Sequence, residues 1–509
     1  MKSHSTFSLP NSQSASYITT MQYIISLIVA VFLCANLQAR KPNVILIMAD
    51  DLGYSELGSY GQKHIKTPYL DKLAENGMKF TAAYSGNAVC APSRCVLMTG
   101  KHPGRAYIRN NGEIKPEGQR PIPDSEVTIA ELLKEEGYAT AAFGKWGLGG
   151  PGSEGDPIFQ GFDRFYGYNC QRHAHSYYPD YLWSNDKRVP LNNKPPVPGH
   201  ASLKKGADPT DPKSYDIFKG IDYAPDHINE QALKFVRDNK DKPFFLYYPT
   251  IIPHVALHVP DEELKPYLDL KWNDPPFSRA KGYGYTPHFT PRAAYAAMIT
   301  RMDRYLGNVF NLVEELGLRD DTIVIFTSDN GTTHLKDEVD YDFFESVKPL
   351  RGLKGSLYEG GIRVPLIASW PGKIQPGSSS VRRIGAEDCL PTILELLGLK
   401  DKSPCSIDGI SFAPTLLGKC QDERPFLYRE FSGYGGQQAL WQGKWKAIRQ
   451  NMLRKNNKDP LKIQLYNLEE DISETTDLAE QHPELVKEMA DMMAKQHTPS
   501  ELFPIPPID

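Results

Sequence analysis

Short apolar runs alternate with longer amphipathic stretches along most of this chain. The apolar runs have the length and composition of buried strands, and they lie at residues 44–48, 139–143, 244–248, 322–327 and 366–369. The amphipathic stretches have helical spacing, and they lie at residues 67–77, 128–136, 225–239 and 290–316. Strands separated by helices of this length predict an α/β fold with a mostly parallel central sheet flanked by helices.

The pattern changes after residue 417. Residues 426–431, 439–449 and 462–468 are typical of antiparallel strands, and residues 483–496 of one amphipathic helix. We therefore expect a smaller C-terminal α+β subdomain with an antiparallel sheet. The predicted parts are an export segment at residues 1–39, a main domain that would carry any catalytic site at 40–418, and the C-terminal subdomain at 419–509.

The export segment contains the most apolar run of the chain, residues 23–37. This run is shorter than the roughly 20 residues that a membrane-spanning helix needs, and it ends at Gln38-Ala39, which is typical of a cleaved signal peptide. We expect an exported protein without a transmembrane segment after signal removal. A periplasmic location is favoured, and secretion or attachment to the cell surface are the alternatives.

Composition narrows the class of protein. Of 509 residues, 40% are hydrophobic and 24% are charged, as in soluble globular proteins. The formal net charge is −4 and no long basic run occurs, which argues against a nucleic-acid partner.

Residues 150–215 and 257–290 are rich in Gly, Pro and aromatic residues. They are too long for simple connections, so we expect ordered loops that shape a binding site. Six cysteines remain after signal removal, and Cys405 with Cys420 could form a disulfide.

Polar side chains directly follow four of the predicted strands. They are Asp50, Asp51, Lys145, His254, Asp329 and Asn330. Each one alone could be a cap or turn residue, but ligands of open α/β sheets bind outside the carboxyl ends of the strands, so we expect these groups to meet. Three carboxylates and one amide oxygen suit a hard cation such as calcium or magnesium rather than zinc, and calcium is favoured.

A second candidate for chemistry is the segment 89–100, with sequence VCAPSRCVLMTG. Pro92 is placed to begin a helix, which would hold Cys90 at a positive helix end beside Arg94. A cysteine in that position could be a nucleophile with a lowered pKa. The alternative is a structural cysteine in front of a helix.

These residues also carry a resemblance. Cys90-Ala91-Pro92-Ser93-Arg94, followed by Leu-Met-Thr-Gly at residues 97–100, resembles the formylglycine signature of type I sulfatases. Gly144-Lys145-Trp146 is similar to the second signature of that family, and residues 354–365 to another of its segments. The resemblance spans about residues 41–500. It implies an arylsulfatase-like sulfuric ester hydrolase of the alkaline phosphatase superfamily.

The resemblance implies cofactors and roles. A sulfatase-maturation enzyme would convert Cys90 to 3-oxoalanine (formylglycine), whose hydrate is the nucleophile in this family. One Ca²⁺ would be held by Asp50, Asp51, Asp329, Asn330 and the modified Cys90. Arg94 would hold the hydrate, and Lys145 and Lys354 would contact sulfate oxygens. His254 or Lys354 would stabilise or protonate the departing sugar oxygen.

The substrate is expected to be a sulfated carbohydrate. The segment 161–183 carries aromatic residues and histidines that suit a sugar ring, although it could be a packed aromatic loop. The candidate substrate-binding residues are His173, His175, His258, Arg109, Asn110 and Asn111. We expect an exo-acting enzyme on 4-sulfated galactose or N-acetylgalactosamine. The alternatives are a phosphatase or phosphonate hydrolase of the same superfamily and a non-catalytic glycan-binding relative. The oxygen-rich set of metal ligands disfavours the first, and the completeness of that set disfavours the second.

One departure from the family pattern carries its own hypothesis. The family usually reads Gly-Lys-x-His, but this chain has Gly147 in place of the histidine. We hypothesise that His173 or His175 fills the space beside Gly147 and accepts a proton there, as an imidazole can near neutrality. The competing interpretation is that both histidines bind sugar hydroxyls.

Overall fold

The computed structural model describes residue 1 and residues 40–115, 117–278 and 284–509. The rest of the predicted signal peptide, residues 2–39, lies outside the described residues. Residues 42–509 form one compact unit. Among the helices described, none combines the length and the apolar character that crossing a bilayer requires.

The centre of the main sheet consists of four parallel strands. They are β1 (Asn43–Ala49), β3 (Ala139–Lys145), β7 (Phe244–Pro249) and β8 (Thr322–Ser328), and all are buried. Ile45 of β1 lies opposite Leu246 of β7 and Val324 of β8, so the carboxyl ends of these strands lie at one edge. This arrangement confirms the predicted α/β class.

The outer strands make the sheet mixed. Among the described residues it has 11 strands in the order β10-β2-β9-β8-β1-β7-β3-β4-β5-β6, with β11 paired to β2. β9 (Arg363–Ser369) runs antiparallel to β8 and to β2 (Met78–Tyr84). Two short strands, β10 (Ser378–Ser380) and β11 (Ile384–Gly385), pair with β2 in parallel. On the other side lie β4 (Arg164–Tyr168), β5 (Tyr181–Ser184) and β6 (Lys187–Pro190).

The two long segments predicted as loops therefore contain regular structure. Residues 150–215 supply β4, β5 and β6, and residues 257–290 contain α6 (Asp261–Leu268). Short 3₁₀ helices lie at Gly58–Tyr60, His173–His175, Pro212–Phe218, Arg319–Asp321, Ala386–Asp388, Lys400–Lys402 and Ala479–Gln481. The predicted disulfide is also absent, because Cys405 and Cys420 are exposed free thiols.

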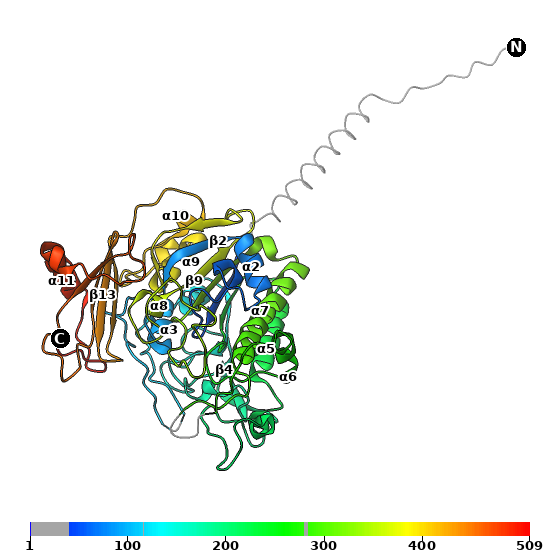
Figure 1. Cartoon of the computed structure of the whole chain (residues 1–509). Coiled ribbons are helices and arrows are strands. Elements are labelled where there is room, and N and C mark those ends of the chain that lie inside the picture. Colours follow the sequence, from blue (N-terminus) through cyan, green and yellow to red (C-terminus); the bar gives the residue numbers. More distant parts are fainter. Residues whose placement is uncertain (2–39, 116, 279–283) are drawn as a thin grey trace. The chain divides into compact units, whose positions relative to one another are not determined.

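Helices cover both faces of the main sheet (Figure 1). Because successive side chains of a strand point to opposite faces, β1 contributes to two cores. Ile45 and Ile47 pack with α2 (Pro68–Glu75), α5 (Ala224–Asp238) and α7 (Pro291–Glu315). Val44 and Leu46 pack with the cluster that contains α3 (Cys90–Thr99), α4 (Ile129–Glu135), α9 (Cys389–Leu396) and α10 (Ala413–Leu416).

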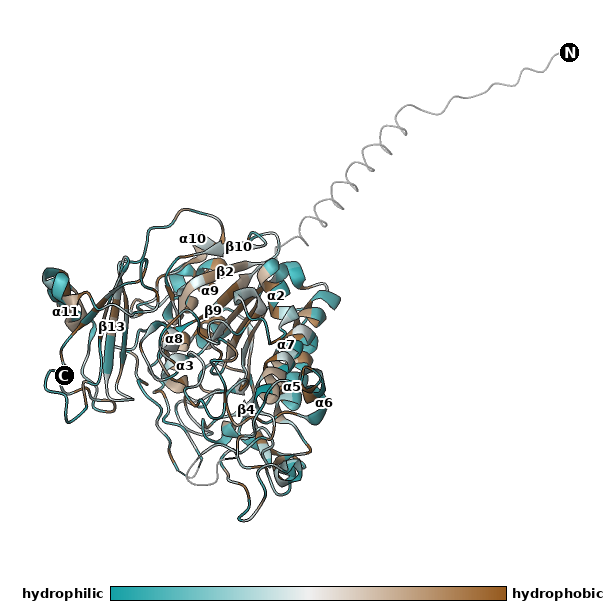
Figure 2. Ribbon diagram, in the orientation of Figure 1, coloured by the Kyte–Doolittle hydropathy of each residue, from teal (hydrophilic) through white to brown (hydrophobic). Residues whose placement is uncertain are grey.

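The C-terminal region has its own antiparallel sheet, as predicted. Its strands are β12 (Leu427–Phe431), β13 (Gln437–Gln442), β14 (Trp445–Arg449) and β15 (Gln464–Asn467). The stretch 439–449 is divided between two of these strands by a turn at Gly443. Met489 and Met493 of α11 (Pro483–Gln496) pack in one cluster with this sheet. Figure 2 shows apolar residues gathered around β2 and β9, and hydrophilic residues on much of α11.

Candidate active site

The carboxyl ends of the central strands bring the predicted polar groups together. Asp50 and Asp51 follow β1, Lys145 ends β3, and Asp329 follows β8. Lys145 Nζ lies 2.6 Å from Asp50 Oδ2, and the backbone N–H of Asp51 donates to Asp329 Oδ1 at 3.1 Å. All four side chains are buried. The parallel register therefore produces the convergence expected from the strand ends.

Helix α3 adds Cys90 and Arg94 to this cluster. Cys90 is the first residue of the helix, and its Sγ lies 3.5 Å from both Asp50 Oδ1 and Lys145 Nζ. Arg94, one turn later, has one amino nitrogen 2.7 Å from Asp329 Oδ2 and 3.6 Å from Asp50 Oδ2. Its other amino group donates to the Lys145 carbonyl at 2.5 Å. The start of α3 is thus fixed against the ends of β1, β3 and β8.

Two further basic groups converge on Asp51. Lys354 Nζ lies 2.7 Å from Asp51 Oδ2 and 3.8 Å from Cys90 Sγ. His254, in the turn after β7, has its Nε2 3.5 Å from the same Asp51 oxygen. The backbone N–H of Lys354 donates to the Thr332 carbonyl at 2.9 Å, which holds its loop beside the end of β8. The five predicted catalytic side chains therefore lie in one cluster.

The protonation states follow from burial and neighbouring charges. Although burial disfavours its charged form, the Lys145 ammonium holds the pKa of Asp50 below its ordinary value. Burial and the Asp50 carboxylate raise the pKa of Asp329 to about 7. Burial, with Asp50 again, raises the pKa of the Cys90 thiol to about 12. The hypothesis of a low-pKa thiolate is therefore wrong. Burial and the Lys354 ammonium lower the pKa of His254 to about 4, so its imidazole is neutral at pH 7.

The same cluster offers ligands for a cation. Ligand atoms of Asp50, Asp51, Cys90 and His254 lie within 4.8 Å of one another. Asn330 donates through Nδ2 to Asp51 Oδ1 at 2.7 Å, while its buried Oδ1 has no hydrogen-bond partner among the described residues. An unpaired buried oxygen costs free energy, and this one lies beside carboxylates that repel one another. Both features fit a cation that prefers oxygen ligands.

His175 and His173 lie differently from one another. The His175 ring stacks on His254, with centroids 4.7 Å apart and planes at 13°, and its Nδ1 is 2.8 Å from His200 Nε2. Burial and the neighbouring His254 lower the pKa of His175 well below its ordinary value. His173 Nδ1 lies 3.2 Å from Glu117 Oε1. His175 therefore belongs to the cluster, and His173 pairs with a carboxylate of another loop.

Neither histidine fills the space beside Gly147. A Cβ built on Gly147 would lie 1.8 Å from Nε2 of Gln171, whose side chain occupies that space, and the glycine φ of +80° is one that other residues rarely adopt. The hypothesis that His173 or His175 takes this place is therefore wrong. No feature of the sequence singled out Gln171, because an amide in an aromatic loop carries no motif.

The other predicted substrate-binding residues form hydrogen bonds or an ion pair with other residues of the protein. His258 is 3% exposed and accepts a 3.4 Å hydrogen bond at Nδ1 from the Tyr177 backbone. Arg109 forms a 2.9 Å ion pair with Glu430. Asn110 donates to Ser432 Oγ at 3.4 Å, and Asn111 Oδ1 accepts from the backbone N–H of Ala91 at 3.1 Å. The segment 109–111 therefore connects the start of α3 to the C-terminal sheet.

Two tyrosines that sequence reasoning missed lie beside this cluster. The Tyr285 ring is 5.1 Å from that of His175 and 5.7 Å from that of His254. Tyr434, in the loop between β12 and β13, is 52% exposed and lies edge-on to His334 at 5.4 Å. Both lie far in sequence from every motif.

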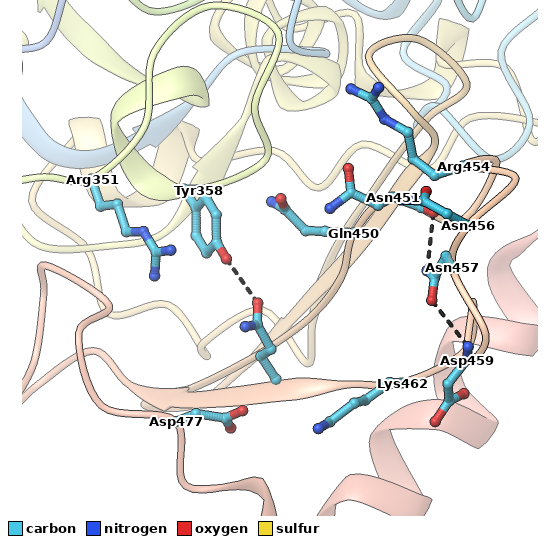
Figure 3. A pocket seen from close by; sticks show the side chains of 11 residues that line it. Arg351, Tyr358, Gln450, Asn451, Arg454, Asn456, Asn457, Asp459, Lys462 and Asp477 are labelled. Atoms are coloured by element: carbon cyan, nitrogen blue, oxygen red, sulfur yellow. Dashed lines mark hydrogen bonds between the residues drawn. The ribbon is translucent and has the colours of Figure 1, made fainter.

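A separate polar cavity of about 710 Å³ lies near the C-terminal sheet (Figure 3). It is lined by Arg351, Tyr358, Gln450, Asn451, Arg454, Asn456, Asn457, Asp459, Lys462, Gln464 and Asp477. The Tyr358 hydroxyl donates to Gln464 Oε1 at 2.7 Å, and Asn457 Nδ2 to the Asn451 carbonyl at 3.0 Å. None of the predicted catalytic or metal-binding residues lines this cavity.

Comparisons with known proteins identify relatives that match most of this chain. The model of a family described as Sulfatase matches residues 42–399, and one described as N-sulphoglucosamine sulphohydrolase, C-terminal, matches residues 352–499. The chain is 31% identical to an N-acetylgalactosamine-6-O-sulfatase of Bacteroides thetaiotaomicron, over 90% of this chain and 94% of that protein. It is 33% identical to arylsulfatase A of Homo sapiens, over 80% and 75%. The crystal structure of Ps i-CgsB in complex with k-i-k-neocarrahexaose aligns with a TM-score of 0.71 at 28% identity, over 90% of this chain and 92% of that one.

Proposed function

The chain belongs to the sulfatase family of sulfuric ester hydrolases, and from that premise we propose that it removes O-sulfate from a sulfated glycan through a group made from Cys90. The observation that carries the proposal is the position of Cys90 Sγ. It lies within 3.8 Å of the ammonium groups of both Lys145 and Lys354 and 3.5 Å from the Asp50 carboxylate. A sulfate beside this atom would meet two cations at once.

Two cofactors belong to the proposal. Asp50, Asp51, Asp329 and Asn330 would hold a calcium ion, which would supply positive charge to the sulfate oxygens when bound. A sulfatase-maturation enzyme would convert Cys90 to 3-oxoalanine, whose hydrate would supply the nucleophilic oxygen. The raised pKa of Cys90 argues against the unmodified thiol as the nucleophile, because a thiol with a pKa of about 12 is a poor nucleophile at neutral pH.

The basic residues around position 90 have separable roles in this proposal. Lys145 and Lys354, which pair with Asp50 and Asp51 here, would donate to sulfate oxygens. Arg94 is held by Asp329 and would orient the group at position 90. Burial disfavours the Lys354 ammonium, yet Asp51 raises its pKa well above the ordinary value, so Lys354 stays protonated. Since His254 is neutral at pH 7, Lys354 is the better donor to the departing sugar oxygen.

We propose that the substrate is the terminal residue of a glycan and that it is a 4-sulfated galactose or N-acetylgalactosamine. The relative from Bacteroides thetaiotaomicron, named for a 6-O-sulfate, supports the same class of sugar and makes 6-sulfate the second candidate. His175, stacked on His254, would contact the sugar. The predicted signal peptide supports a periplasmic location.

Sulfate release from a panel of sugars tests this proposal. Galactose and N-acetylgalactosamine sulfated at position 4 or 6 are compared with the corresponding phosphate esters, and the released anion is measured by ion chromatography. We expect sulfate release with a preference for one position, and none from Cys90→Ala. Phosphate release as fast as sulfate release would favour the phosphatase alternative instead.

A further inference from the structure

A loop of the C-terminal sheet, residues 432–436, reaches the segment that carries Lys354. A Cβ built on Gly355, the residue after Lys354, would lie 2.7 Å from the Tyr434 ring. The Gly355 N–H donates at 2.9 Å to the carbonyl of Ala88, two residues before Cys90. The Tyr434 ring therefore packs against the backbone of Gly355. That backbone is hydrogen-bonded to the segment that leads into Cys90.

The same loop is fixed from a second side. Ser432 accepts the hydrogen bond from Asn110, whose neighbour Asn111 accepts from the Ala91 N–H. Burial raises the pKa of the Tyr434 hydroxyl, although the nearby Lys354 ammonium acts in the opposite direction. Both sets of contacts place Tyr434 beside the sulfate-binding cations.

The Tyr434 ring is held on one side and remains accessible on the other. It lies 5.9 Å from the buried ring of Phe431, tilted by 31°, and edge-on to His334 at 5.4 Å. Despite these contacts it is 52% exposed. An aromatic residue that is packed in place but half open to solvent has the form of a ligand-binding surface.

The backbone of Tyr434 also favours a functional side chain over a structural one. Its φ is +50°, a left-handed conformation that is sterically unfavourable for a tyrosine. Three glycines, at positions 433, 435 and 436, flank it, and a glycine at position 434 would adopt this φ without that cost. Strain of this kind persists at binding and catalytic sites, where the side chain has a use.

We infer that Tyr434 is a sugar-binding residue of the active site, and that the pyranose whose sulfate contacts Lys354 packs its apolar face on the Tyr434 ring. The inference rests on the proposed glycan sulfatase function. It assigns the C-terminal sheet a part in substrate selection, because the sheet places this ring beside the cations. The ligand class is a sulfated pyranose.

Kinetics of position 434 variants on a sulfated monosaccharide test the inference. Tyr434→Ala should raise KM about tenfold, the size expected for losing one aromatic packing contact, and Tyr434→Phe should stay near wild type. Thermal protection by inorganic sulfate should be the same in all three proteins, because sulfate offers no ring to pack. Phe159→Ala, which removes a 56% exposed aromatic side chain from the loop between β3 and β4, is the matched control and should change neither quantity.

Tyr434→Gly separates binding from folding. It should lose sugar affinity like Tyr434→Ala but melt at an equal or higher temperature than Tyr434→Ala, because glycine relieves the left-handed strain. A wild-type KM in both variants, or a loss of sulfate protection equal to the loss of sugar affinity, would overturn the inference. If the wild type released no sulfate from any sugar, the proposed function would fail instead.

Discussion

The protonation of Asp329 depends on its charged neighbours in the candidate active site. Its Oδ2 binds Arg94 and its Oδ1 accepts from the Asp51 backbone, while burial and Asp50 raise its pKa to about 7. Arg94 is fully buried, and its other carboxylate, Asp50, is 3.6 Å away. One side chain therefore balances a buried cation and, in the proposed calcium site, would also supply one of the ligand oxygens.

Replacing Asp329 by Ala should destabilise the protein by about 3–5 kcal/mol, because it leaves the Arg94 charge buried with incomplete compensation. Urea unfolding measures the change, and calcium retained after dialysis should fall as well. Asp329→Asn, which keeps an acceptor for the Asp51 N–H, is the matched control and should lose less stability. Wild-type stability and metal content in the Ala variant would contradict this role.

Gly147→Ala should destabilise the protein by about 1–3 kcal/mol, because the new Cβ meets Gln171 at 1.8 Å and the φ of +80° suits glycine. Thermal unfolding measures the loss. Adding Gln171→Gly should restore the part caused by the clash and leave the part caused by φ. A single variant as stable as wild type would show that Gln171 moves away without cost.

At this scale the sequence predicted the groups that a strand end positions. Asp50, Lys145 and Asp329 directly follow or end buried parallel strands, so their meeting follows from the sheet itself. Gln171 and Tyr434 could not be predicted, because each is placed by a glycine distant in sequence, Gly147 and Gly355. Only the folded chain shows those approaches.

At the scale of elements, the strands that the sequence predicted are those buried on both faces. Such strands appear as continuous apolar runs, as in β1, β7 and β8. The strands β5 and β6 have four residues each and are largely not buried, so their sequences show no apolar run long enough to predict a buried strand. Their place at the edge of the sheet depends on pairing with β4.

A buried charge network joins α8 (Glu359–Ile362) to the C-terminal sheet. Lys446 Nζ of β14 lies 3.0 Å from Glu359 Oε1 and 2.6 Å from Glu474 Oε1, and all three side chains are fully buried. Trp441 donates to the same Glu359 oxygen at 2.9 Å. Since α8 follows the Lys354 loop, this network connects the sheet to the segment that carries Lys354.

Lys446→Met should therefore destabilise the protein by about 3–5 kcal/mol, because two buried carboxylates lose their shared cation. Denaturant unfolding provides the measurement. Lys462→Met removes an exposed lysine near β15 and should stay within about 0.5 kcal/mol of wild type. Equal stabilities of the two variants would mean that the network does not hold the sheet in place.

At the scale of the whole molecule, buried ion pairs connect the C-terminal sheet to the rest of the chain. Arg429 of β12 pairs with Glu387 at 2.8 Å, and Glu430 pairs with Arg109 at 2.9 Å. His497, after α11, contacts Glu430 at 2.8 Å and Asp509 at 3.0 Å. The C-terminal segment is thereby fixed to the same carboxylate that holds the segment 109–111.

The His497 contacts predict a pH dependence of stability. Burial lowers the pKa of His497, but Glu430 and Asp509 raise it above its ordinary value overall. A raised folded-state pKa stabilises the protein fully below the unfolded value of about 6.5, and this contribution is lost as the pH rises through the folded value. The stability difference between wild type and His497→Gln should therefore shrink above about pH 6.5 in unfolding experiments. A difference independent of pH would contradict the ion pairs.

The most direct test of the account is the mass of the peptide that contains Cys90. The protein is produced with and without a sulfatase-maturation enzyme, and both samples are assayed for sulfate release from a sulfated sugar. We predict that only the sample carrying 3-oxoalanine or its hydrate at position 90 is active, and that activity rises with the converted fraction. Full activity in protein whose Cys90 is an unmodified thiol would contradict the formylglycine mechanism.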